Sequence, residues 1–311
     1  MTWRRYSLTV GLPQTNYRHL AEAKILMEAC NFFWWSLGEG IGRPVSQLRA
    51  AAGDPLYATI FFVEEVYPRE RTLGTFRLDD RLRFAVALRA ITGLSVEGRV
   101  LFDREDRLAD GSDPEALWRA TPAAHPTILF GSLFGTPQSD NSALKLSAPG
   151  NASLSALPRL PLEENKLQIA RTAQQSGQLG VIREDWVPLD PAGPHEANYV
   201  IDADRDTNAA GLVYFANYVS FLEIGERQAI PAAAADGRSR TRADLDGRQL
   251  LHRRIAYYGN AGLSDRIVIS VSRFAPAADQ RLLGVRCRLN RARDGTQIGL
   301  SEAIFLLSPG G

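Results

Sequence analysis

The chain has 311 residues, of which 45% are hydrophobic and 23% charged, and its 36 basic and 35 acidic side chains leave a formal net charge of +1. This balance excludes a general nucleic-acid-binding protein, which needs a basic surplus to neutralise phosphates. It leaves room for a local basic patch. The length predicts about two domains, and the composition is that of a soluble globular protein.

Cysteine and histidine usage argues against disulfides and metals. Cys30 lies in an apolar helical run and Cys287 in a strand-like run, as buried free thiols of a reducing compartment do. The four histidines form no HxH or HExxH pattern. The N-terminus lacks the apolar core of a signal peptide, and no stretch approaches about 18 uninterrupted apolar residues. We therefore expect a cytoplasmic protein with no metal, no resident cofactor and no membrane or nucleic-acid partner.

The first half predicts one long helix among strands. Apolar side chains recur at three- and four-residue spacing over residues 19–37, and Gly38 and Gly40 end this helix. Its aromatic stripe from Phe32 to Trp35 reads as core, with an apolar ligand wall as the alternative. Aromatic and β-branched runs predict strands at residues 6–10, 57–63, 81–91, 94–102 and 127–134.

A composition shift separates the two halves. Pro, Ser, Asn and Gly become dense after the first half, which predicts a linker over residues 139–176 with a short helix near residues 163–174. The predicted domains are therefore residues 1–138 and 177–311.

The second half repeats the order of the first. A helix is predicted at residues 213–229, with strands at residues 181–187, 198–202, 250–258, 263–271, 281–291 and 297–306. Each half carries an Asp-Arg turn that feeds a long strand, at residues 78–84 and 263–269, an offset of about 185 residues that suits two copies of one domain. Strands without intervening helices predict an antiparallel sheet packed on the helix, and hence an α+β class.

This order of elements resembles the hot-dog fold, in which a sheet wraps around a central helix. Residues 206–218, Asp-Thr-Asn-Ala-Ala-Gly-Leu-Val-Tyr-Phe-Ala-Asn-Tyr, resemble the helix-start signature of acyl-CoA thioesterases of the hydroxybenzoyl-CoA type. Where those thioesterases place a catalytic aspartate, this chain has Asn208. The resemblance implies a tandem hot-dog protein, and the departure disfavours ordinary thioester hydrolysis.

A narrower resemblance covers most of the chain. The segments at residues 10–16, 55–62, 211–218 and 256–260 occur in an order similar to the double-hot-dog acyltransferase/decarboxylase of the leinamycin polyketide pathway. In that family a methylmalonyl group is taken from coenzyme A and decarboxylated, and the propionyl group passes to the phosphopantetheine thiol of an acyl carrier protein. The resemblance implies acyl-CoA and an acyl carrier protein as partners, and Tyr57 as the acylated catalytic residue.

Decarboxylation beside a thioester passes through an enolate, so donors must point at the thioester oxygen in a dry pocket. The start of the second helix offers backbone N–H groups, Gly211 would let a thioester approach them, and Asn208 and Asn217 offer neutral amide donors. We expect catalytic roles for Asn208 and Gly211 and substrate binding by Asn217. The alternatives are an N-cap or turn for Asn208, a packing glycine, and a helix–sheet hydrogen bond.

Further substrate-binding candidates come from both halves. A phenol has an ordinary pKa of about 10, so a nucleophilic Tyr57 needs a neighbouring base or a lowered pKa. Asn16 and His19, at the start of the first helix, are candidates to face it, and a surface position is the alternative for His19. Tyr258 and Asn260 end a strand with turn chemistry, and Arg254 could bind coenzyme A or carrier-protein phosphates.

Two other functions stay open at this stage. One is an acyl-thioester hydrolase or dehydratase of the same fold, and the other is a non-catalytic acyl- or carrier-protein-binding module. An open pocket near Tyr57 and Gly211 would favour catalysis, whereas filled pockets would favour the binding module. The acyl group, the carrier protein and the formation of a homodimer are not determined by the sequence.

Overall fold

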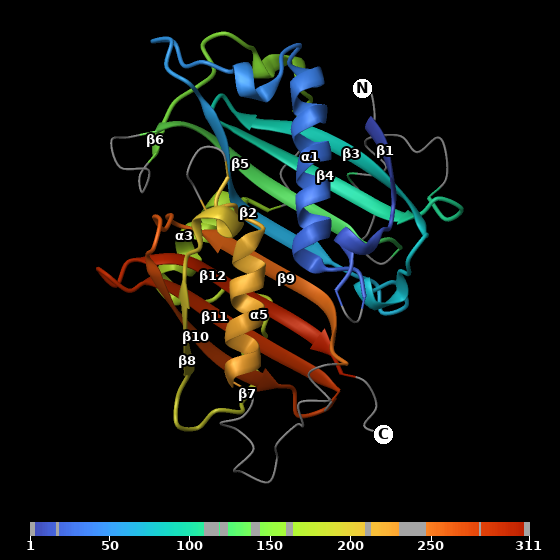
Figure 1. Cartoon of the computed structure of the whole chain (residues 1–311), viewed down its shortest axis with the longest axis vertical. Helices are drawn as coiled ribbons and strands as arrows, with labels where there is room; N and C mark the ends of the chain where they lie inside the picture. The colour runs from blue at the N-terminus through green and yellow to red at the C-terminus, as the bar shows by residue number, and fades with distance from the viewer. Residues whose placement is uncertain are drawn as a thin grey trace. The chain divides into compact units, whose positions relative to one another are not determined.

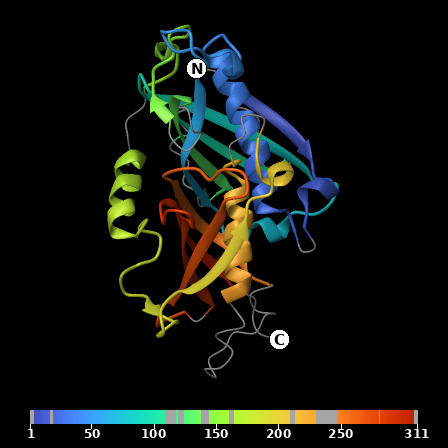
Figure 2. The ribbon, with the colours of Figure 1, turned by 60° about the vertical axis from the view of Figure 1, so that its left-hand side comes forward.

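The computed structural model describes residues 4–16, 19–108, 118, 124–137, 144–159, 164–208, 213–229, 247–279 and 281–307. The chain divides into two compact units, Met1–Leu167 and Gln168–Gly311. In the views of Figures 1 and 2, each unit consists of one sheet with one long helix lying across a face of it.

The first unit is an antiparallel sheet around helix α1 (Glu22–Gly40). Its main strands run in the order β1-β3-β4-β5-β2, so β2, the strand that follows α1 in the chain, lies at the opposite end of this order from β1. They are β1 (Arg4–Thr9), β2 (Tyr57–Val66), β3 (Arg81–Thr92), β4 (Ser95–Arg104) and β5 (Thr127–Pro137). Short 3-10 turns are η1 (Leu12–Gln14), η2 (Val45–Gln47) and η3 (Leu73–Thr75).

Helix α1 forms because its apolar positions recur with helical spacing, and it stays on the sheet because one face of it is aromatic. The Phe32 ring centroid lies 4.9 Å from that of Phe84 on β3, and the Phe33 centroid lies 5.6 Å from that of Phe130 on β5. A Cβ atom on Gly98 of β4 would lie 2.2 Å from the Phe33 ring, so only glycine leaves room for it. The predicted core role of Phe32 and Phe33 is confirmed.

The second unit repeats this arrangement around helix α5 (Asn217–Ala229). Its strands run in the order β9-β12-β11-β10, and both β8 and β7 pair with the outer edge of β10. The elements are α3 (Lys166–Ser176), β7 (Val187–Pro188), β8 (His195–Val200), α4 (Ala203–Asp206), β9 (Gln249–Tyr257), β10 (Arg266–Ala275), β11 (Leu282–Arg291) and β12 (Gln297–Leu306).

Strand by strand, β8, β9, β10, β11 and β12 take the places of β1, β2, β3, β4 and β5, and α5 takes the place of α1. The same connectivity therefore occurs twice. The duplicated α+β tandem hot-dog fold predicted from the sequence is confirmed.

The segment whose composition predicts a linker is ordered in large part by the first unit. Strand β6 (Leu144–Leu146) pairs with β5, and the 3-10 turn η4 (Leu154–Ala156) follows it. Leu154 and Leu157 are buried, and the backbone N–H of Ala90 donates to Pro158 at 2.9 Å. A Pro- and Ser-rich segment can join a folded unit when a few apolar side chains anchor it.

The strand expected at residues 181–187 is not formed, apart from Val187 in β7. The buried Glu302 carboxylate accepts the backbone N–H groups of Val181 (2.9 Å) and Ile182 (3.3 Å), and it pairs with Arg286 at 2.7 Å. Val181 and Ile182 are buried, which is why their pattern resembles a strand. A side chain satisfies this backbone where a neighbouring strand would otherwise do so.

Each unit also contains a buried aspartate held by an arginine and a histidine. In the first, Asp103 Oδ2 lies 2.8 Å from Arg71 Nη1 and 2.9 Å from His125 Nδ1. Burial opposes ionisation of Asp103, but the hydrogen bonds of His125 and of the Arg104 backbone, with the charge of Arg71, outweigh it and lower its pKa below the ordinary value.

In the second unit, Asp190 accepts the backbone N–H of Arg273 at 2.8 Å and its Nε at 3.0 Å, and His195 Nε2 lies 3.0 Å away. Burial again opposes ionisation, and the Arg273 and His195 interactions outweigh it, so the pKa of Asp190 is lowered as well. Both units therefore gain stability from an ionised aspartate.

The stability of the protein should depend on pH through these two carboxylates. Their folded-state pKa values are lower than the value of about 3.9 in an unfolded chain, so their contribution is complete above that pH and is lost as pH falls through the folded-state pKa. We expect Asp103→Asn and Asp190→Asn each to lower the free energy of unfolding at pH 7 by about 1–3 kcal/mol. The deficit relative to wild type should shrink at pH 3.

Urea unfolding at both pH values measures this difference. Asp185→Asn is the control, because the Arg183–Asp185 pair is exposed and such pairs contribute about 0–1 kcal/mol. A deficit of equal size at both pH values would contradict the ionic origin of the effect.

Candidate functional site

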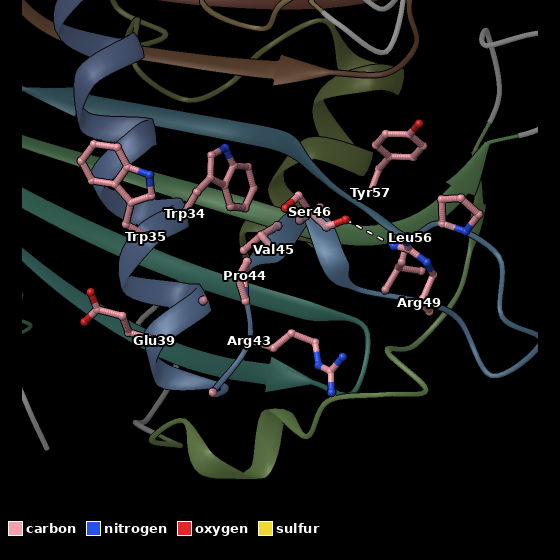
Figure 3. A pocket seen from close by; sticks show the side chains of 14 residues that line it. Trp34, Trp35, Glu39, Arg43, Pro44, Val45, Ser46, Arg49, Leu56 and Tyr57 are labelled. Carbon is pink, nitrogen blue, oxygen red and sulfur yellow. Dashed lines mark hydrogen bonds between the residues drawn. The ribbon is translucent and has the colours of Figure 1, made fainter.

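The first unit contains an open pocket of about 910 Å³, formed by the C-terminal end of α1, the loop after it and the start of β2 (Figure 3). Trp34 and Trp35 project into it from α1 and Tyr57 from β2, while Arg43 and Arg49 lie on the connecting loop. Tyr57, which the sequence analysis predicts as a catalytic residue, is among the residues that line it.

The end of α1 determines where Arg43 lies. Gly42 has a φ of 70°, its N–H donates to Glu39 at 3.3 Å, and the N–H of Arg43 donates to Gly38 at 2.8 Å. These two hydrogen bonds form a Schellman motif, which needs a left-handed residue that glycine adopts without strain. Pro44 follows and prevents continuation of the helix. The chain therefore leaves α1 along the pocket.

The segment that the sequence predicts as a linker holds the backbone of Arg49 in place. Its backbone N–H donates to Asn151 Oδ1 at 2.9 Å, and Asn151 Nδ2 donates to Gln47 at 3.0 Å. Its guanidinium Nη1 donates to the carbonyls of Leu48 at 2.8 Å and Ser46 at 3.2 Å. The Arg49 side chain is thus fixed by neutral acceptors, and its positive charge is not cancelled by them.

The aromatic stripe of α1 divides between core and pocket. Trp34 is half-buried, with its ring centroid 4.5 Å from that of Phe33, and Trp35 is 56% exposed beside Tyr6 and Phe32. Both tryptophans line the pocket, which is the ligand-wall alternative of the sequence analysis, whereas the two phenylalanines form core.

Tyr57 is half-buried at the first position of β2, paired with Gly135 of β5. Within the described residues no side chain or backbone group hydrogen-bonds to its hydroxyl, so no described base is in position to take its proton. The pocket beside Tyr57 is open. An open pocket favours catalysis, whereas a filled one would favour a non-catalytic binding module.

The pocket lining carries more positive than negative charge. Glu39 Oε2 pairs with Arg4 Nη1 at 2.5 Å, so its charge is compensated. Arg43 is exposed, and among the residues that the structure describes its guanidinium has no ion-pair or hydrogen-bond partner. Together with Arg49 it leaves the pocket with a positive balance.

Asn16 and His19 do not line this pocket. Asn16 Oδ1 accepts the backbone N–H of His19 at 3.0 Å, and His19 Nδ1 lies 2.7 Å from the Leu20 carbonyl, in the turn before α1. Helix α1 has 19 residues, so this turn lies roughly 28 Å from the end of the helix at the pocket. The expectation that Asn16 and His19 face Tyr57 is wrong, because they lie at the opposite end of α1.

In the second unit, Asn217 begins α5 and its amide is occupied. Its Nδ2 donates to the carbonyls of Arg205 at 3.2 Å and Asp206 at 3.0 Å. Asp206 is buried and accepts from the Tyr199 hydroxyl at 2.7 Å and the Asp202 backbone at 2.8 Å. Burial and the hydrogen bond to Asp206 raise the pKa of Tyr199 to about 12. These groups hold the turn before α5.

Tyr258 and Asn260 lie near the same helix start. Tyr218 of α5 donates its hydroxyl to the Gly259 carbonyl at 3.2 Å and to Asn260 Oδ1 at 3.4 Å. Burial raises the pKa of Tyr258, and its hydroxyl has no hydrogen-bond partner among the described residues. The structure thus brings together the second-half candidates Asn217, Tyr258 and Asn260 around one helix start.

The remaining candidates lie elsewhere. Asn208 is exposed, and Gly211 lies outside the described residues. Arg254 Nη1 donates to the Leu179 carbonyl at 3.1 Å, and its neighbour Arg253 is buried 3.6 Å from Glu226 of α5. Arg254 is thus held within its own unit, and phosphate binding by Arg254 stays a prediction.

Sequence reasoning missed Arg43, Arg49 and Asn151. A signal for Arg43 exists, because Gly42-Arg43-Pro44 is a helix-end pattern of glycine followed by proline. Asn151 had none, since its partners are about a hundred residues earlier in the chain.

The described residues contain no group of three His, Cys, Asp or Glu side chains arranged to hold a metal ion. None of the helices in this part of the chain is both long and apolar enough to cross a membrane.

Comparison with known proteins identifies the fold only. No protein-family model and no curated protein sequence matches the chain. Solved structures similar to it include the 12:0-ACP thioesterase from Umbellularia californica (TM-score 0.65, 8% identity, covering 98% of this chain and 94% of that one). A Lactobacillus plantarum structure described as an oleoyl thioesterase has a TM-score of 0.64 and 10% identity, covering 99% and 98% of the two chains.

An acyl-ACP thioesterase from Bacteroides thetaiotaomicron is also similar, with a TM-score of 0.58 and 10% identity, covering 97% of each chain. All three matches extend over nearly the whole length of both proteins, so the similarity includes both hot-dog units.

Removal of the Asn151 side chain should loosen the loop that carries Arg49. We expect Asn151→Ala to increase amide hydrogen exchange over residues 43–56 by about tenfold, because two hydrogen bonds to that loop are lost. Ser155→Ala, an exposed change in the same segment, should leave exchange unchanged. Mass-spectrometric exchange measures both, and equal protection in wild type and Asn151→Ala would contradict the role of Asn151.

Proposed function

We propose that the protein is an enzyme that acts on acyl thioesters, and that its reaction is decarboxylative acyl transfer in polyketide biosynthesis. The acyl donor is a malonyl- or methylmalonyl-CoA, and the acceptor is the phosphopantetheine thiol of an acyl carrier protein. The observation that carries the proposal is that Tyr57, to which the sequence resemblance gives the acyl-accepting role, opens into the pocket of the first unit.

The proposed reaction has three balanced steps. The Tyr57 oxygen attacks the thioester carbonyl, the C–S bond breaks, and the phenol proton ends on the sulfur, so that coenzyme A departs as the thiol. The C–C bond to the α-carboxylate then breaks, carbon dioxide leaves, and the electron pair forms an enolate that takes up one proton. Finally the carrier-protein thiol attacks the tyrosyl ester, and the phenol is released with its proton.

Several features of the pocket suit these steps. The tryptophans give the pocket a wall of low polarity, which strengthens interactions with the developing charge. The positive balance from Arg43 and Arg49 favours binding of the anionic substrate. For a thioester bound within the second unit by itself, we retain the prediction that Asn208 and Gly211 supply donors to the enolate oxygen.

The second candidate is an acyl-ACP or acyl-CoA thioesterase. The names of the similar structures favour it, since each is described as a thioesterase. The second unit disfavours it, because the aspartate that the resembled thioesterases use has no free counterpart at the start of α5. Asp206 is buried and accepts hydrogen bonds from its own turn, and Asn208 stands where the resembled thioesterases have an aspartate.

Incubation with methylmalonyl-CoA followed by intact-mass measurement tests the proposal. We expect an acyl adduct on the wild type and propionyl transfer to a holo carrier protein. In Tyr57→Phe the adduct should be absent and transfer reduced at least a hundredfold, because the nucleophile is removed. Tyr6→Phe, on β1, is the matched control: Tyr6 is half-buried like Tyr57 but does not line the pocket, so this variant should retain both.

The products separate the alternatives. Free propionate or methylmalonate without carrier-protein acylation would support the thioesterase. Equal transfer by wild type and Tyr57→Phe would refute a tyrosyl ester. Saturable binding of the thioester without turnover would leave only the binding module.

A further inference from the structure

The pocket has a property that the chemistry of Tyr57 does not require. Two arginines six residues apart lie on one loop and line one cavity, with Glu39 as the acidic side chain beside them. Because Glu39 is compensated by Arg4 at 2.5 Å, two positive charges remain. In a chain with a formal net charge of +1, this is a local excess.

Arg49 is preorganised for an anion. Its Nη1 is bound to two backbone carbonyls, and its backbone is held by Asn151. Little side-chain entropy remains to be lost when a ligand binds, and the other N–H groups of the guanidinium stay available. Neutral acceptors orient the group without cancelling its charge, as phosphate binding requires.

Arg43 complements it as a mobile partner. It follows the Schellman turn at Gly42, so its backbone position is set, while its side chain is exposed and makes no described polar contact. A planar guanidinium can bind two phosphate oxygens at once. Both guanidinium groups border the same pocket, so each can donate to a phosphate bound there.

The remaining lining matches the rest of a phosphopantetheine arm. Ligand pockets typically have volumes of about 300–1,000 Å³, and this one has about 910 Å³. Trp34, Trp35, Val45 and Leu56 give it an apolar wall for the dimethyl and methylene groups of the arm. A small inorganic anion would leave most of this wall uncovered.

We propose that Arg43 and Arg49 bind the phosphate of a phosphopantetheine arm whose thioester end lies in the pocket. Coenzyme A and a holo carrier protein both carry this group, as a pyrophosphate in the first and a phosphodiester in the second. The assignment rests on the proposed function, since it places the carrier of the acyl group in the pocket of Tyr57. It adds a recognition site that the reaction at Tyr57 does not itself imply.

Calorimetric binding of unreactive probes tests the assignment without turnover. The probes are pantetheine, 4′-phosphopantetheine, coenzyme A, and a carrier protein in its apo and holo forms. Wild type should bind 4′-phosphopantetheine at least tenfold more tightly than pantetheine. Arg43→Gln and Arg49→Gln should each remove about tenfold of this preference and leave pantetheine binding unchanged.

Arg43→Gln keeps the experiment decisive if Arg49→Gln disturbs the loop, because the Arg43 side chain has no described contact to lose. Arg81→Gln is the matched control: Arg81 is exposed at the start of β3, opposite the end of β1, and does not line the pocket. It should retain wild-type binding of every probe.

Each outcome decides a separate point. If wild type prefers coenzyme A to pantetheine and the arginine variants lose this preference, the site binds the acyl donor. If wild type prefers the holo to the apo carrier protein and the variants lose this preference, the site binds the acyl acceptor. Equal phosphate preference in wild type and both variants would overturn the assignment. Failure of the proposed function is distinguishable, because the adduct would then be absent while phosphate-dependent binding by the two arginines persisted.

Discussion

The structure depends first on how closely each central helix approaches its sheet. In the first unit the approach is made by Phe33, whose ring occupies the space that a side chain at Gly98 would need. In the second unit the small residue is on the helix, where a Cβ on Gly225 would lie 2.5 Å from Ile269. The small residue that permits the close approach therefore lies on the sheet in the first unit and on the helix in the second. Phe33 fixes the rotation of α1 about its own axis. The next two residues of the aromatic stripe therefore point away from the core, and Trp35 is exposed beside the pocket.

The pocket follows from how α1 ends and how the chain then reaches β2. A left-handed glycine turns the backbone, and residues 44–56 run back to the first position of β2. A loop of this length would be mobile if its backbone faced only water. Here Asn151 binds the backbone at both Gln47 and Arg49, and the backbone N–H of Gly150 donates to Arg49 at 2.7 Å. The segment with the most linker-like composition is therefore what makes the pocket a defined shape.

Most of the fold, and part of the site, could be predicted from local sequence pattern. Helix and strand periods place nearly all elements because burial on one face dictates them. The pattern failed at residues 181–187, where burial is strand-like but Glu302 takes the backbone hydrogen bonds. The tryptophans were identifiable because they stand on a regular helix, whereas Tyr57 was singled out only by the resemblance of residues 55–62, since its local pattern is that of any strand tyrosine. Arg43 and Arg49 were not, since a loop arginine gains meaning only from what surrounds it, and the ion pair of Glu39 with Arg4 joins distant parts of the sequence.

A physical criterion separates the two regions where site residues were expected. Around the start of α5, the polar groups other than the Tyr258 hydroxyl are occupied by the fold: the Asn217 amide donates to two carbonyls, and Asp206 accepts from its own turn. Such groups stabilise the native state because their hydrogen bonds are complete, and a ligand that took them would leave buried donors unpaired. At the end of α1 the balance is reversed. Arg49 is held by carbonyls that leave its charge intact, and the guanidinium of Arg43 has no partner within the described part of the chain. Charge left uncompensated beside an apolar cavity is the condition under which an anionic ligand gains most from binding, which is why the recognition of substrate is expected in the first unit.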